Sequence, residues 1–131
     1  MEVVLLIQDE TPRGELIQSV RVTLSKEKLS LREFVRTRVQ QEVERFNLQR
    51  PVCFKALVRP EDAQETTQGF RLSQHRDLDW ERQAEEAISA LESKSFFVTL
   101  DGKEVSSLDE EMSLNSGSDL RFVILMPVVG G

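Results

Sequence analysis

Two runs in the first part of the chain have the spacing of strands. In the first, Val3, Leu5 and Ile7 alternate with Val4 and Leu6, and alternation resumes over Leu16–Leu24 after the polar, turn-forming segment Asp9–Gly14. Because alternation is typical of half-buried strands, the pattern predicts a β-hairpin with a long loop.

The spacing then changes to that of an amphipathic helix. Ser30 and Glu33 form a capping box, in which each side chain can accept a hydrogen bond from an exposed amide. Apolar residues follow at spacings of three and four and predict a helix to about Asn47; they are Leu31, Phe34, Val35, Val39, Val43 and Phe46. The polar positions are expected to form a solvated face; they include Arg32, Arg36, Arg38, Glu42 and Glu44.

The pattern is weaker over residues 48–94. A strand is predicted over Val52–Val58, and the polar segment Glu61–His75 has no period and is expected to be a loop pinned by Phe70 and Leu72. A second helix is predicted after the capping residue Asp79. Its apolar residues recur at helical spacing; they are Trp80, Ala84, Ala87, Ile88 and Leu91.

Strand character returns after residue 95. A hairpin is predicted from Phe96–Leu100 through the turn Asp101-Gly102. A connector, Ser106–Asn115, then leads to a last strand, Leu120–Met126, in which Phe122, Ile124 and Met126 are expected to face one side. Pro127 ends this strand because proline cannot donate to the ladder. The elements together predict an α+β fold.

Length and composition narrow the possible functions. A chain of 131 residues is expected to form one domain over 1–131. The net charge of −6 and the absence of long basic clusters argue against nucleic acid as a partner, and no segment is long enough to span a membrane. Cys53 and His75 are the only soft ligands, so we expect no metal, no disulfide and a reducing, cytoplasmic location. No set of residues suggests catalysis, so no catalytic residue is assigned.

The sequence ends in a segment that suggests chemistry of a different kind. Gly130 and Gly131 lack a Cβ and follow Pro127, Val128 and Val129. Such a segment can lie extended in a narrow enzyme groove without side-chain obstruction. We expect residues 127–131 to be a flexible tail, with Gly130 and Gly131 as the site of activation and Pro127, Val128 and Val129 as the segment that an enzyme recognises.

The order of elements resembles that of the ubiquitin-like β-grasp proteins, a mixed sheet of four to five strands packed on a helix. The resemblance covers residues 1–47 and 95–131. The resemblance is greatest to the small subunit of molybdopterin synthase and the thiamine sulfur carrier. In these proteins a turn and the last strand lead into a tail of the type Pro-Pro-Val-Ala-Gly-Gly. The matching segments of this chain are Leu114–Leu120 and Met126–Gly131. The insertion of about residues 48–94 has no counterpart in those compact carriers.

This resemblance implies that the protein is a substrate and not an enzyme. An E1-like enzyme would use MgATP to adenylate the Gly131 carboxylate, and the protein itself would need no cofactor. The insertion favours an enlarged bacterial ubiquitin-like modifier, which is joined to target lysines by an isopeptide bond. Its further partners would be an E2-like enzyme, a processing protease and acceptor proteins. Self-association would be another role. The alternatives are a sulfur carrier with a Gly131 thiocarboxylate and a non-conjugated β-grasp binding module that uses an exposed Phe70 and a sheet edge.

Overall fold

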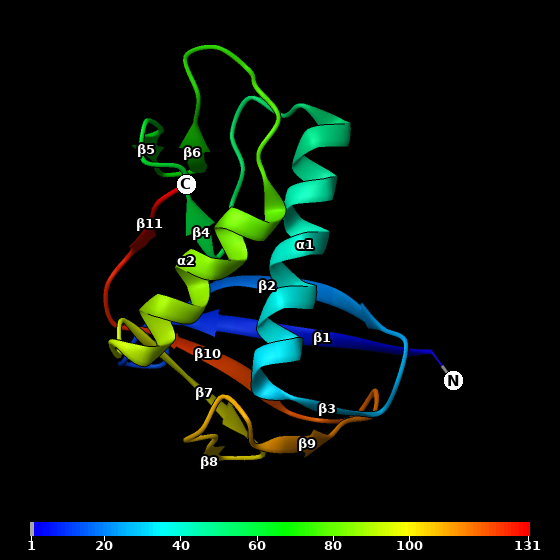
Figure 1. The fold of residues 1–131 in the computed structure, drawn as a ribbon. Coiled ribbons are helices and arrows are strands. Elements are labelled where there is room, and N and C mark those ends of the chain that lie inside the picture. Colours follow the sequence, from blue (N-terminus) through cyan, green and yellow to red (C-terminus); the bar gives the residue numbers. More distant parts are fainter. Residues whose placement is uncertain (1) are drawn as a thin grey trace.

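A computed structural model describes residues 2–131 and shows an α+β fold around a mixed five-stranded sheet (Figure 1). Met1, with which the expected domain begins, lies outside the described residues. The strand order is β2-β1-β10-β7-β8. These strands are β1 (Val3–Glu10), β2 (Leu16–Leu24), β7 (Phe96–Leu100), β8 (Lys103–Glu104) and β10 (Leu120–Ile124). β1 and β10 are parallel neighbours, whereas the other pairs are antiparallel.

Both predicted hairpins are confirmed. In the first, β1 pairs with β2 from Val3 opposite Leu24 onward, and alternate side chains are buried along β1 and from Val20 to Leu24 in β2. In the second, β7 and β8 are joined through Asp101 and Gly102, whose φ angles are +52° and +85°. Asp-Gly tolerates these left-handed conformations, which is why this dipeptide is a reliable turn signal.

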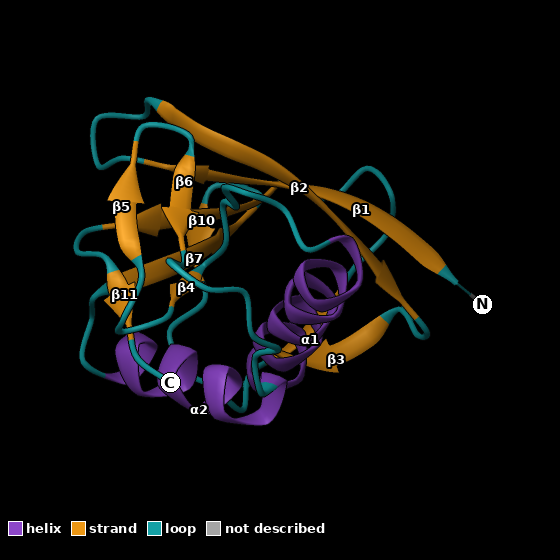
Figure 2. Ribbon diagram, turned by 90° about the horizontal axis from the view of Figure 1, so that it is seen from above, coloured by secondary structure: helices purple, strands orange, loops and turns teal. Residues whose placement is uncertain are grey.

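Two helices pack with the sheet. α1 (Leu31–Gln49) crosses the sheet, and α2 (Trp80–Glu92) lies beside α1 (Figures 1 and 2). The predicted caps are present: Ser30 Oγ accepts from the Glu33 amide at 3.1 Å, and the Asp79 carboxylate accepts from the Glu81 amide at 3.1 Å. A short antiparallel pair, β3 (Lys28–Ser30) and β9 (Glu111–Ser113), lies at the start of α1.

The core between α1 and the sheet is built around three phenylalanine rings. Phe96 and Phe122 stack with centroids 5.6 Å apart, and Phe34 reaches Phe122 from α1 at 6.1 Å. The last strand ends at Ile124 and not at Met126, which is 56% exposed. The expectation that Met126 faces inward with Phe122 is therefore wrong. The chain leaves the sheet two residues earlier, where both the Leu125 and Met126 amides donate to the Ser95 carbonyl at 2.9 Å.

The insertion is more ordered than its sequence suggests. The expected loop Glu61–His75 contains a hairpin of β5 (Gln64–Thr66) and β6 (Gly69–Arg71), whereas the predicted strand Val52–Val58 is mostly irregular before β4 (Val58–Arg59). Phe70 is 3% exposed and packs against Phe46 with centroids 5.4 Å apart. The expectation of an exposed Phe70 is wrong because this ring anchors the hairpin to α1.

Part of the predicted solvated face of α1 is buried. Arg38 is fully buried, and its guanidinium donates to Asp9 at 2.6 Å and to Glu42 at 3.3 Å. Glu42 also accepts from the Leu57 amide at 3.1 Å. Burial raises the pKa of Glu42 despite the nearby positive charge of Arg38. Burial alone would disfavour the charged guanidinium, but the carboxylates of Glu42 and Asp9 raise the pKa of Arg38.

The solvated-face prediction failed because position in the helix matters more than polarity. Arg38 and Glu42 lie between the buried positions Phe34, Val39 and Phe46. Side chains there face the core, and a buried charge must then be paired. Neither helix of residues 2–131 has the length and apolar character that a membrane crossing needs.

Candidate functional site

The C-terminal segment forms a strand on the insertion. β11 (Val128–Val129) pairs in parallel with β4, with Val128 opposite Val58 and Val129 opposite Arg59 (Figure 1). The Gly130 amide continues the pairing by donating to the Arg59 carbonyl at 3.0 Å. The expectation of a flexible tail over residues 127–131 is therefore wrong for this structure. The pairing in the main sheet already ends at Ile124, before Pro127, and the residues after Pro127 pair with backbone groups of β4.

α2 contributes two polar side chains to the wall against which the tail ends. A Cβ on Gly130 would overlap the side-chain end of Glu86, and one on Gly131 would lie 2.8 Å from Gln83 Nε2. Gly131 also has a φ of +77°, a conformation that favours glycine. At Gly131 the positive φ favours glycine, whereas at Gly130 the overlap is with the end of the flexible Glu86 side chain, which can move away.

Gln83 is an unusual residue for a helix face. Its side chain is 1% exposed, yet neither Nε2 nor Oε1 has a hydrogen-bond partner among residues 2–131. Leaving a buried polar group unsatisfied costs about 1–3 kcal/mol. This cost exists while the tail covers Gln83, because Gly131 lies against the amide.

The burial of Val128 is the main side-chain contribution that holds the tail, and it is similar in size to the cost at Gln83. Val128 is 5% exposed, and full burial of a valine side chain stabilises by about 1.5–3 kcal/mol. Val129 and Pro127 are exposed and add little. The docked tail is held by the burial of one valine and by pairing over two residues, so it is held weakly compared with the core.

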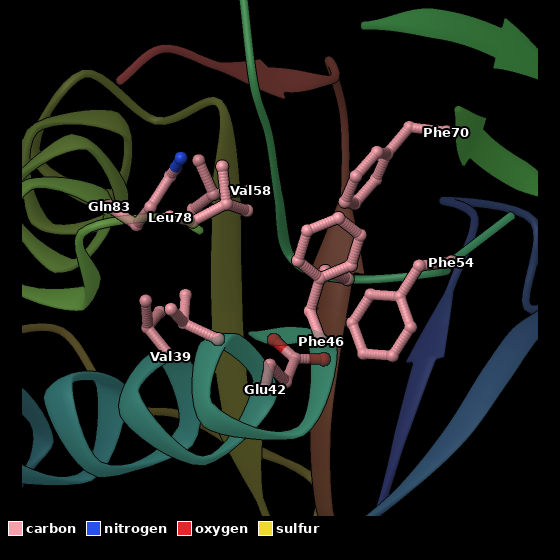
Figure 3. Close-up of a pocket in the computed structure, with 10 residues that line it drawn as sticks. Val39, Glu42, Phe46, Phe54, Val58, Phe70, Leu78 and Gln83 are labelled. Carbon is pink, nitrogen blue, oxygen red and sulfur yellow. The ribbon is translucent and has the colours of Figure 1, made fainter. Parts of the chain in front are cut away.

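A small cavity lies between α1, α2 and the insertion (Figure 3). Gln83 lies at one end and the rings of Phe46, Phe54 and Phe70 at the other. Its volume of about 10 Å³ is close to the minimum for one water molecule and far below that of a small-molecule site. The remaining lining residues are Val39, Glu42, Val43, Ala56, Val58 and Leu78.

The residues predicted from the sequence lie in one segment that runs along β4 and ends against α2. This segment is Pro127, Val128, Val129, Gly130 and Gly131. Sequence reasoning missed the residues that this segment contacts, which include Arg59, Gln83 and Glu86. Gln83 carried a usable signal, because it lies within the apolar helical spacing of α2.

Cys53 and His75 each contact neighbouring side chains of the insertion or α1. Cys53 is half-buried and lies 3.8 Å from the Thr66 hydroxyl, whereas the His75 ring stacks on Phe46 with centroids 5.3 Å apart. Within residues 2–131, no three His, Cys, Asp or Glu side chains are grouped so as to hold a metal ion.

None of the protein-family models, curated proteins and solved structures compared with this chain matches it. A functional interpretation therefore depends on two features of the chain itself. They are the position of β10 in the sheet and the seating of the glycine tail against β4 and α2.

Proposed function

We propose that the protein is a ubiquitin-like modifier with a β-grasp fold, whose Gly131 carboxylate is adenylated by an E1-like enzyme and transferred to lysine amines. One observation carries this proposal: the central strand β10, parallel to β1, leads through Pro127 directly into Val128–Gly131. A mixed sheet packed on a helix, followed by a glycine tail, is the arrangement that the resemblance implies. An E2-like enzyme, a processing protease, acceptor proteins and a cytoplasmic location belong to the same proposal.

The proposed reaction activates a poor acyl donor. A Gly131 carboxylate oxygen attacks the α-phosphorus of ATP, forms an acyl adenylate and releases pyrophosphate. An enzyme thiolate then displaces AMP, and a lysine amine displaces the thiolate and loses a proton to give the amide. Dividing one difficult step into easier ones is the general advantage of covalent intermediates.

The insertion supports a modifier over a compact sulfur carrier. Residues 48–94 have no counterpart in such carriers, yet here they contribute both β4 and α2, the two elements that contact the tail. Because the insertion contacts the tail that would react, we infer that the insertion serves the function of the tail. A sulfur carrier remains as an outcome of the experiment below.

A second candidate is a binding module that is never conjugated. Gly131 has a positive φ and lies against Gln83, so the fold itself favours glycine at this position. In this case the two glycines serve docking and not activation. Because Phe70 is buried, the interface would use a sheet edge, at β2 or β8, without this ring.

The direct experiment combines the protein, MgATP and the E1-like enzyme encoded nearest to its gene, and follows the intact mass. The modifier predicts an AMP adduct and, once the thiolate, E2-like enzyme and acceptor are present, a lysine conjugate. A carrier instead replaces a carboxylate oxygen by sulfur when a sulfur donor is added. An unchanged mass under all conditions would favour the binding module.

Matched glycine variants show whether the chemistry belongs to the tail. Deleting Gly131 should abolish the adduct. Gly117→Ala, in an exposed turn, should leave its formation unchanged. Adduct formation at an equal rate in both variants would contradict activation at Gly131.

A further inference from the structure

The docked tail has the features of a segment that can open without unfolding the core. Its pairing to β4 covers only Val128 and Val129, with one further hydrogen bond from Gly130. The chain before it, Leu125 and Met126, is exposed and is fixed mainly by two amides that share the Ser95 carbonyl. Elements with few buried contacts lie at the low end of the local stability range.

Gln83 opposes the docked state. Its amide is buried without a partner in the described chain, and Gly131 lies against it, so departure of the tail would remove part of what covers the amide. The burial of Val128 acts in the other direction. A segment held by few contacts and opposed by an unpartnered amide can populate two arrangements.

We propose that β11 is a latch that holds Gly131 against α2 in the free protein, so that Gly131 is activated only after β11 leaves β4. This inference rests on the proposed function. In the docked state Val128 is buried and Gly130 lies against Glu86, so the last residues cannot enter another protein's groove. Once released, residues 127–131 reach roughly 17 Å from the body of the protein, enough to extend into an enzyme active site.

A reversible crosslink tests the latch directly. Val129 and Arg59 are paired across β11 and β4, and adjacent strands lie about 4.8 Å apart, within the range of about 4.4–6.8 Å that a disulfide needs. The variant carries Val129→Cys and Arg59→Cys, with Cys53→Ser to remove the native thiol. Activation by the E1-like enzyme is measured on the oxidised and the reduced form of this one protein.

The latch predicts that oxidation slows activation at least about tenfold and that reductant restores it, since the rate follows the fraction of open tail. The protein with Val129→Cys and Cys53→Ser, without Arg59→Cys, should respond to neither treatment. Equal activation of the crosslinked and reduced forms would overturn the latch.

A second variant changes the latch without touching the tail. Gln83→Leu removes the unpartnered amide, so exchange of the Gly130 amide with solvent should become about tenfold slower and activation should slow with it. Gln64→Leu, at an exposed glutamine of β5, is the matched control and should change neither rate.

The exchange measurement separates the two proposals. If no form of the protein is activated but Gly130 is protected and Gln83→Leu increases that protection, the proposed function fails and the docked strand stands. If Gly130 exchanges at the rate of an unstructured amide in the unmodified protein, the latch is wrong whatever the activation assay gives.

Discussion

Removing the buried guanidinium of Arg38 should destabilise the protein more than any other single charge removal. Arg38→Met retains a side chain of similar length but leaves Asp9 and Glu42 buried without their positive partner. Breaking a buried pair in this way costs about 3–5 kcal/mol. A domain of 131 residues has a total stability of about 7–20 kcal/mol, so the loss is a large fraction of it.

An exposed arginine provides the control. Arg121 also contacts two carboxylates, those of Asp119 at 2.9 Å and Glu10 at 3.3 Å, but its side chain is 42% exposed. Arg121→Met should therefore cost less than about 1 kcal/mol. The comparison holds the residue type and the number of carboxylate partners constant, whereas Arg38 is buried and also lies over the Phe122 ring.

The assay is urea unfolding followed by circular dichroism at neutral pH and again at about pH 5. The loss in Arg38→Met should shrink at the lower pH, because burial raises the pKa of Glu42 and protonation of Glu42 removes a buried charge. A loss no larger than that of Arg121→Met, or one that does not depend on pH, would refute the view that Arg38 compensates Asp9 and Glu42.

Three further predictions concern other buried groups. The folded-state pKa of Glu42 is raised above its usual 4.5, so the protein becomes less stable as the pH rises through that folded pKa. Glu42→Gln should remove this loss of stability with pH. An unchanged pH profile of the urea midpoint in the variant would contradict this prediction. Phe70→Ala should lower the free energy of unfolding by about 3–5 kcal/mol, measured by thermal or urea unfolding, because the ring is 3% exposed. A decrease under about 1 kcal/mol would indicate that residues 61–75 form a loop without an anchoring side chain. Cys53→Ser should change stability by no more than about 0.5 kcal/mol and leave activation intact, since Cys53 is only half-buried and its thiol makes one long contact with Thr66; inactivity with an intact fold would show chemistry at this position.

Features set by neighbouring residues could be predicted from the sequence. The caps at Ser30 and Asp79 and the turn at Asp101-Gly102 depend on a few consecutive residues, and all three are present. The alternation in β1 and β2 likewise predicted their pairing. Each of these signals is local, so no knowledge of the tertiary fold was needed.

Features that join distant segments could not be predicted. Arg38 is buried because Asp9 reaches it from β1, and the spacing within α1 alone does not reveal that partner. The tail docks on Val58 and Arg59, a strand of two residues that has no periodicity to detect. The residue types at the candidate site were predicted, but the groove that receives them was not.

The central claim is that the Gly131 carboxyl group becomes joined to lysine. The most direct measurement is tryptic peptide mass spectrometry of the protein and its adducts isolated from cells of its own source. Trypsin cleaves after Arg121, so a modified lysine should carry the branch Phe122–Gly131 through an isopeptide bond. The account predicts such branched peptides, and predicts their loss in cells that express Gly131-deleted protein. Recovery of Phe122–Gly131 only as a free carboxylate or thiocarboxylate, with no branched lysine, would contradict it.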